Sequence, residues 1–461
     1  MNKSYFLLFL FSFLLLHSCV TYYQKSAKFN KLFECGQLEA ADKLLAKNKK
    51  AKRRKIRLLY YLNRGMLAHL MGKYEESNYF FEQAYLMHED FLARPVNEAL
   101  AFVINPTVTD YRGEDHEVLL IHYYKTLNFL QLGKNNEALV ECRRLNSKLH
   151  QLSDKYQSDN KYRRDAFIHT LMGLVYQANH DYNNAFIAYR NAVEIYQEDY
   201  KRLFGVDIPE QLKQDLLYTA YKTGFYDQVY QYEQLFNLKY NPSEEDSGGE
   251  LVFLWNNGLG PIKSEWDISF MIVRGSGGSV TLVNEELGLF FPFPLGSNSS
   301  ATGTLSDVRF IQVAFPQYVE RPPLYDHAVI STNDHTYPFE IVEDINAISF
   351  KVLNQRMLLE FSKSLLRVAL KKAAEYQLRS KADQLGALIG VVNLVTEKAD
   401  TRNWQTIPHS IYYTRVTLPA GQQQISFQTF SKKSPQDNQR EDFDLHVQQG
   451  QTLFYTFSSL R

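Results

Sequence analysis

The chain lacks the features that identify most catalytic and nucleic-acid-binding proteins. Its 51 basic and 51 acidic residues cancel, so no overall field attracts nucleic acid or an anionic surface. It has no Gly-x-Ser-x-Gly elbow, no His-Glu-x-x-His motif and no phosphate-binding loop, and its histidines are not spaced as zinc ligands. We therefore predict a protein that is not an enzyme, binds no metal or cofactor and has no nucleic-acid partner.

Cysteine is scarce, and no apolar run is long enough to cross a membrane as a helix. Cys35 and Cys142 fall inside helical patterns and are predicted to be buried free thiols. A disulfide between them is the alternative, which their spacing does not decide. The internal apolar stretch 385–395 has eleven residues and the N-terminal stretch 5–16 has twelve, whereas a bilayer takes about 20. Neither stretch predicts a transmembrane helix.

The N-terminal apolar stretch instead belongs to a targeting segment. It follows the positive Lys3, and Leu16-His17-Ser18-Cys19 at its end resembles the lipobox of bacterial lipoproteins. The resemblance implies that residues 1–18 are a lipoprotein signal peptide and that an acylated Cys19 holds the protein in a lipid bilayer. Val20, and not an acidic residue, follows the cysteine, which resembles lipoproteins sorted to the outer membrane. No acidic run comes after it, which resembles a lipoprotein that faces the periplasm and is not displayed on the surface. An ordinary secretory signal with an incidental cysteine is the alternative.

The spacing of small and aromatic residues predicts paired helices over residues 19–240. Small residues recur where two antiparallel helices must approach closely, and Asn179-His180-Asp181 predicts a turn between two of them. Similar units are expected at 58–91 and 119–152, with weaker ones near Gly36 and Gly224. This recurrence is typical of tetratricopeptide (TPR) repeats. The clearest unit has its small and aromatic positions at Gly173, Tyr176, Tyr182, Ala185, Tyr189 and Ala192.

A regular stack of such units has an inner groove in which a protein or an extended peptide binds. Residues from two of the units are predicted to line this groove, and ordinary core between the repeats is the alternative. The predicted protein-binding residues are Leu62, Met66, His69, Leu70, Thr170, Leu174 and Gln177.

Residues 47–57, between the first two units, are almost entirely basic. A charge run of this kind is usually the solvated face of a helix or loop. Contact with anionic lipid headgroups is the alternative, because each cation close to such a surface contributes about 1 kcal/mol.

A polar linker at residues 241–249 separates the helical half from a half with strand periodicity. Residues 250–461 are predicted to form an α+β domain, in which short strands surround a helical segment at 347–398. The first two strands are expected to flank a turn at Asn257-Gly258. The predicted strands are 250–255, 267–273, 279–283, 308–315, 327–332, 339–342, 411–418, 425–430 and 452–457.

A polar corner at residues 399–404 follows the helical segment. Its charged residues predict a structural brace, in which Arg402 pairs with Asp400 or Glu397. The alternative is an exposed contact point at Arg402 and Trp404, since both residue types are common in binding hot spots.

Several stretches together resemble a family of uncharacterised bacterial TPR envelope lipoproteins. The resemblance lies in the lipobox at Cys19, in residues 124–133 with 141–145, in 181–189 and in the corner at 399–404. It implies an envelope lipoprotein with N-terminal helical repeats and brings no known activity. We therefore expect a membrane-anchored protein–protein interaction scaffold for envelope assembly or maintenance. The alternatives are a ligand- or glycan-binding module in the C-terminal half and a regulator of cell-wall synthesis.

Overall fold

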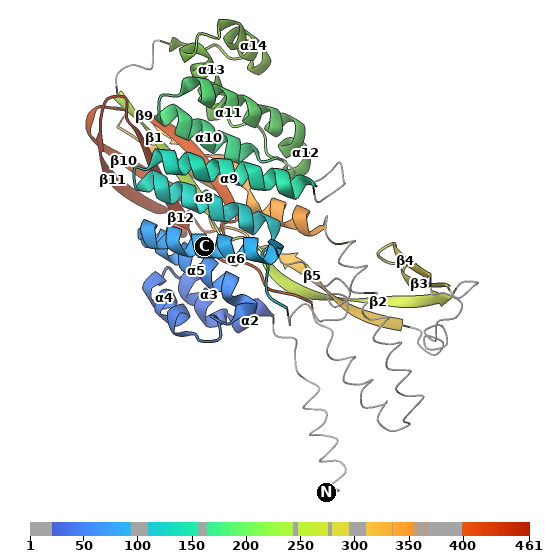
Figure 1. The fold of residues 1–461 in the computed structure, drawn as a ribbon. Coiled ribbons are helices and arrows are strands. Elements are labelled where there is room, and N and C mark those ends of the chain that lie inside the picture. The colour runs from blue at the N-terminus through green and yellow to red at the C-terminus, as the bar shows by residue number, and fades with distance from the viewer. Residues whose placement is uncertain are drawn as a thin grey trace, which may run out of the picture.

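The structure is a computed structural model that describes residues 21–93, 109–154, 164–242, 248–274, 279–294, 310–333, 335–354, 357, 365 and 399–461. Within these ranges the chain mixes helices and strands, in agreement with an α+β class. Helices of the first half stack side by side against strands of the second half, and a further group of strands extends away from the body (Figure 1). The expected signal peptide, Cys19 and the stretch 385–395 lie outside the described residues.

Helices occupy the first half of the chain and pack in consecutive pairs. Partners in contact are α3 with α4, α5 with α6, α8 with α9, α10 with α11, and α13 with α14. Their bounds are α2 (Tyr22–Lys25), α3 (Ala27–Glu34), α4 (Leu38–Lys47), α5 (Arg57–Leu70), α6 (Tyr74–Ala93), α8 (Asp115–Gln131), α9 (Asn135–Asp154), α10 (Ala166–Ala178), α11 (Tyr182–Ile195), α12 (Lys201–Phe204), α13 (Glu210–Lys222) and α14 (Tyr226–Phe236).

A turn of one kind joins the helices of each pair. Its middle residue has a left-handed backbone, and the next residue's N–H donates to the carbonyl five residues earlier, as from Lys73 to Ala68 at 2.8 Å. This bond satisfies a carbonyl that the helix end leaves without a partner. Glycine adopts such a backbone at no steric cost. The five turn centres are Gly36, Gly72, Gly133, His180 and Gly224.

Glycine also allows the close approach that the sequence spacing predicts. A Cβ atom on Gly173 would lie 2.2 Å from Cε1 of Tyr189, and one on Gly65 would lie 2.7 Å from Cε1 of Phe81. Both distances are far inside the contact distance of two carbon atoms. Two helix pairs therefore use the same device, in which a buried aromatic ring lies directly on a glycine.

The described strands form three four-stranded sheets, and all nine predicted strands are among them. β12 (Thr452–Ser459), β1 (Gly248–Asn257), β9 (Ser410–Pro419) and β8 (Glu340–Asp344) make the first, which we call the central sheet. The second is β11 (Gln439–Val447), β10 (Gly421–Phe430), β6 (His327–Ser331) and β7 (Thr336–Pro338). The third is β4 (Leu289–Pro294), β3 (Ser279–Asn284), β2 (Ile262–Arg274) and β5 (Phe310–Val319).

The first two strands do not form the predicted hairpin. β1 pairs with β9 and β12, whereas β2 pairs with β3 and β5 in a different sheet. Residues 258–261 between them are buried, and Gly260 N donates to Ile407 O at 2.8 Å. The backbone at Ile407, three residues after the polar corner, thus holds a connection between two sheets where a two-strand turn was expected.

Three strands escape sequence prediction, each for a local reason. β11 is polar and exposed along most of its length, β7 has three residues, and β4 contains Pro292 and Pro294. Of the predicted helix at 347–398, residues 347–354, 357 and 365 are described, and all of them are helical. Cys142 is buried and free as predicted, but Cys35 is free and exposed, because it lies at the end of α3.

Strand β1 packs against both the helices of the first half and the second sheet. It is buried on both faces, so its residues alternate between two apolar clusters. Val252 and Leu254 belong to the cluster that contains the helices, whereas Phe253 and Trp255 belong to the cluster with the second sheet. The linker at 241–249 therefore marks a change of secondary structure along the sequence, but the helices before it and β1 after it share one apolar cluster. Its last two residues, Gly248 and Gly249, already lie in β1.

Candidate functional site

Most residues predicted to line a protein-binding groove are interior residues. Leu62, Met66, His69, Thr170, Leu174 and Gln177 are buried, and Leu70 is half-buried. Their polar atoms have internal partners: His69 Nδ1 lies 2.7 Å from Asn128 Oδ1, and Tyr189 OH donates to Gln177 Oε1 at 3.0 Å. The groove prediction is wrong for the buried six, because these side chains pack between helices.

The chain's own C-terminal half covers the helices on this side. Tyr123 of α8 donates to Asn256 Oδ1 of β1 at 2.9 Å. Tyr196, after α11, donates to the carbonyl of Val342 in β8 at 2.8 Å. The central sheet therefore occupies, within the same chain, a face on which a partner was expected.

The contact-point interpretation of Arg402 and Trp404 is also wrong, because residues 401–408 are buried. The Trp404 ring lies 5.8 Å from that of Phe81 and 6.0 Å from that of Tyr124, measured between ring centres. Its Nε1 donates to Thr406 Oγ1 at 2.7 Å. Trp404 therefore packs between two helices as an interior residue, and it does not line the pocket mouth that the alternative placed beside it.

Arg402 is the structural brace that the sequence predicted, and Asp400 is its partner. Its guanidinium donates to the Asp400 carboxylate at 2.6 and 2.8 Å, and to the carbonyls of Lys55 and Thr109 at 2.8 and 2.9 Å. Planar Arg–carboxylate pairs of this kind are the stronger ion pairs. The corner is thereby attached to the basic run and to the segment before α8.

A second buried arginine links the central sheet to the helices. Arg415 Nη1 lies 3.2 Å from Glu250 Oε2, Nη2 lies 3.2 Å from Tyr189 OH, and Nε lies 3.4 Å from Asp215 Oδ1. Tyr413 OH donates to the same Asp215 carboxylate. Burial raises the pKa of Asp215, and the nearby Arg415 charge acts against that rise.

Glu117 is a third buried charge at the interface. Its carboxylate accepts from Tyr111 OH and Trp404 N, both at 2.6 Å, and from Glu114 N at 3.1 Å. Burial, and secondly the Glu114 charge, raise its pKa from 4.5 to about 7. Glu114 itself pairs with the buried Lys263 of β2.

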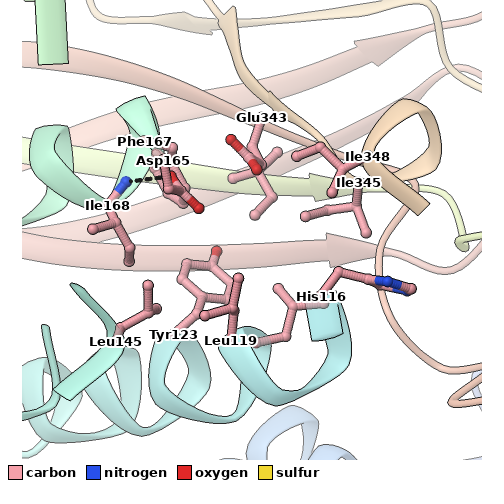
Figure 2. Close-up of a pocket in the computed structure, with 12 residues that line it drawn as sticks. His116, Leu119, Tyr123, Leu145, Asp165, Phe167, Ile168, Glu343, Ile345 and Ile348 are labelled. Carbon is pink, nitrogen blue, oxygen red and sulfur yellow. Dashed lines mark hydrogen bonds between the residues drawn. The ribbon is translucent and has the colours of Figure 1, made fainter. Parts of the chain in front are cut away.

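Figure 2 shows a small cavity between α8, α10 and the end of β8, with Glu343, Asp165 and Tyr123 among its lining residues. Its volume is about 20 Å³, which suits a single water molecule. Burial raises the pKa of Glu343 well above its usual value, and Tyr200 OH donates to it at 2.9 Å. This cavity is too small for a substrate.

A much larger cleft, of about 700 Å³, opens beside the first described residues. Its lining residues come from α2 and α3, from the end of α4 with the basic run, and from the corner at Asp400, Thr401 and Arg402. Part of the lining is apolar, from Phe29, Leu44, Leu45, Ala51 and Ile56, and part is cationic, from Lys25, Lys28, Lys50, Arg53, Lys55 and Arg402.

Hydrogen bonds fix the backbone of the basic run along the cleft. Asn48 Oδ1 accepts from Lys50 N at 3.0 Å and from Ala51 N at 3.2 Å. The Lys55 carbonyl accepts from Arg402 Nη1 at 2.8 Å and from Tyr111 N at 3.0 Å. The cations therefore extend from a loop whose backbone is held by hydrogen bonds, and their exposed side chains agree with the predicted solvated charge run.

Five cations of the cleft have no acidic partner among the described residues. Lys25, Lys28, Lys50, Arg53 and Lys55 form no ion pair with a carboxylate in these ranges. The single lining carboxylate, Asp400, is already bonded by Arg402. Cations of the neighbouring helices differ, since Arg64 pairs with Asp42 and Glu76, and Lys125 pairs with Glu82 and Glu141.

Sequence reasoning identified only one of the three segments that build the cleft. The basic run was visible as a charge pattern, and Arg402 was predicted as a structural brace, with a surface contact as the alternative. Nothing in the sequence brings α2, α3 and residues 400–402 together with the basic run, because 347 positions separate Lys55 from Arg402. The hydrogen bond between Tyr22 N and Thr401 Oγ1 at 2.9 Å completes the arrangement.

Other kinds of site are not found in the described parts of the chain. Within these parts no three His, Cys, Asp or Glu side chains are grouped so that they would hold a metal ion. No described helix combines the length and apolar character needed to cross a membrane. The cleft is therefore the candidate site that the geometry singles out.

No protein-family model and no curated protein matches the chain. Among solved structures, the chain is similar to the crystal structure of BtubC (BKLC) from P. vanneervenii. The match covers 49% of this chain and 80% of that chain, at 16% identity and a TM-score of 0.29. A likeness this distant carries no inference about fold or function.

Proposed function

We propose that this protein is an envelope lipoprotein, anchored through Cys19 on the periplasmic side of the outer membrane, that acts as a protein–protein interaction scaffold. The five equivalent turns and the two glycine–aromatic contacts support TPR-like helix pairs as its framework. The central sheet fills the face that such repeats commonly leave for a peptide. The partner must therefore bind elsewhere on the stack.

The last helix of the stack carries this proposal. No residue of α14 is buried, and Tyr226 and Tyr230 are each 63% exposed, one turn apart on the same face. Leu235 is 57% exposed in the next turn. The end of a helical-repeat stack usually presents a polar surface to water. An apolar end supports contact with another protein.

In-cell crosslinking, followed by purification and mass spectrometry, tests the scaffold. We expect a partner in near-stoichiometric amount with the wild type, and its loss in the variant Tyr226→Ser/Tyr230→Ser. The matched control is Tyr79→Ser/Leu86→Ser on α6, where the side chains are 59% and 51% exposed. Capture of the same partner by both variants contradicts a role of α14.

The anchor has a separate test. Thr21 caps α2 and is the second residue after Cys19, so the Cα atoms of Cys19 and Thr21 are at most about 7 Å apart. This short distance supports a body held directly at the membrane surface. We expect wild-type protein to incorporate a labelled fatty acid and Cys19→Ser to incorporate none. An unlabelled, freely soluble wild type would instead indicate an ordinary secretory signal.

A further inference from the structure

The charge of the cleft selects an anion as its ligand. Five cations converge on one space without a carboxylate partner in the described chain, although the whole protein has a net charge of zero. Like charges held close together repel, and an anion placed between them removes that repulsion. Asp400 does not serve as this anion, because Arg402 already binds both of its oxygens.

The size and lining of the cleft select an amphiphile over a simple ion. About 700 Å³ is within the range of sites for small organic ligands and is far more than a phosphate ion fills. Phe29, Leu44 and Ile56 are half-buried along the same space. An ion alone would leave this apolar surface in water, whereas a molecule with a charged head and an aliphatic part covers both surfaces.

The position of the cleft indicates that its amphiphilic ligand is a membrane lipid. Its lining begins at Tyr22, so the Cα atom of Cys19 is at most about 10 Å away along the chain. This distance is comparable to the Debye length of about 8 Å at physiological ionic strength. If Cys19 is acylated, the cations of the cleft therefore lie near the headgroup layer of the same membrane.

We infer that the cleft binds the phosphate-bearing headgroup of an acidic phospholipid. Lys25 and Lys28 from the first helices, together with Lys50, Arg53 and Lys55 from the basic run, supply the cations that bind the phosphate. The apolar lining contacts the first carbons of the acyl chains. The choice of a lipid rests on the proposed membrane attachment, but the binding itself does not require Cys19.

Vesicle sedimentation tests this binding without the acyl anchor. The probe is the chain 20–461, which keeps every residue that the structure describes. It is mixed with vesicles of phosphatidylcholine alone, or of phosphatidylcholine with phosphatidylglycerol. We expect binding only when phosphatidylglycerol is present, and a decrease as salt is added, because salt screens exposed charges.

Two triple variants with equal loss of charge distinguish binding in the cleft from a general electrostatic attraction between the protein and the vesicle. The cleft variant is Lys28→Gln/Arg53→Gln/Lys55→Gln. The control is Lys31→Gln/Lys49→Gln/Lys52→Gln, from the same helix and loop but outside the cleft lining. We expect the cleft variant to lose on the order of 100-fold in vesicle affinity, since each cation near the surface contributes about 1 kcal/mol. The control should lose only a few-fold.

Two outcomes overturn the inference. Equal losses in both variants would mean that the surface attracts lipid only through its net charge. Unchanged vesicle binding in the cleft variant would show that the cleft does not bind lipid. Its ligand would then be another anion, such as an acidic protein segment. Circular dichroism and thermal melting of both variants verify that they fold.

Soluble competitors distinguish the lipid from free phosphate. Glycerol phosphate should compete weakly with the vesicles, and inorganic phosphate more weakly still, because neither covers the apolar lining. Tight binding of inorganic phosphate alone, without vesicle binding, would reject the lipid. Failure of fatty-acid incorporation at Cys19 would reject the anchor but leave this result unchanged, so the two proposals fail separately.

Discussion

Arg415 and Arg53 carry the same guanidinium group in opposite surroundings. Arg415 is buried between helices and the central sheet, where Asp215 and Glu250 neutralise it. Arg53 is exposed beside the cleft and has no carboxylate partner among the described residues. A buried charge without a counter-ion is very costly, whereas an exposed one is stabilised by water. Interface charges therefore maintain the fold, and cleft charges remain available to a ligand.

Trp404→Ala should give the largest loss of stability and tests whether the halves share one core. The ring is fully buried against two helices, so its removal should cost about 4 kcal/mol. Helix signal and the fluorescence of Trp255 and Trp266 should change together during denaturant unfolding. Two separate transitions would show that the helical and strand halves are independent domains.

Arg415→Met should cost about 3–4 kcal/mol, because it leaves the buried Asp215 carboxylate without its counter-ion. Adding Asp215→Asn should recover part of that loss in the double variant. Arg440→Met is the control, since its pair with Asp442 is exposed and should contribute less than about 1 kcal/mol. Equal effects at the two arginines would remove the distinction between buried and exposed pairs.

Glu117→Gln should change the pH dependence of stability. Its pKa is about 7 in the folded protein and 4.5 when unperturbed, so the folded state binds the proton more tightly. The stabilisation is complete below pH 4.5 and is lost as the pH rises to about 7, by about 3 kcal/mol in total. Relative to wild type, the variant should gain that amount between these pH values in chemical denaturation. A constant difference across pH would contradict the raised pKa.

The cleft variant, Lys28→Gln/Arg53→Gln/Lys55→Gln, should have the smallest effect on stability. None of the three side chains has an ion-pair partner in the described chain, so its removal should change the unfolding free energy by less than about 0.5 kcal/mol. Weaker repulsion should make any change a gain, more visible at low salt. A loss of several kcal/mol would show that these cations support the fold.

Sequence periodicity predicted the paired helices and most of the strands well, because its causes are local. A glycine at a helix end, or opposite an aromatic residue of the next helix, has a fixed spacing that the chain itself displays. Gly173 and Tyr189 behave in this way, and the predicted strands are present for the same reason. Their partners in the three sheets are not local, which explains the wrong hairpin at Asn257-Gly258.

The site predictions failed because burial depends on what covers a face. Leu174 and Met66 have the pattern of either a groove or a core, and only the position of the central sheet decides between them. Trp404 is equally ambiguous, since a tryptophan suits an interface and an interior. The cleft required segments from both ends of the sequence to meet, which no pattern in residues 47–57 records.

The position of β1 also has a consequence for biosynthesis. Its neighbours β9 and β12 come from the last part of the chain, so the helices remain uncovered until those strands are made. Translation at about 5–20 residues per second needs roughly 10–45 s to proceed from Phe236 to Ser459. During that time the apolar faces of α8 and α10, which contact β12 and β8 in the folded protein, are open to aggregation. A chaperone that shields this nascent surface should therefore raise the yield of folded protein more than one that acts after release.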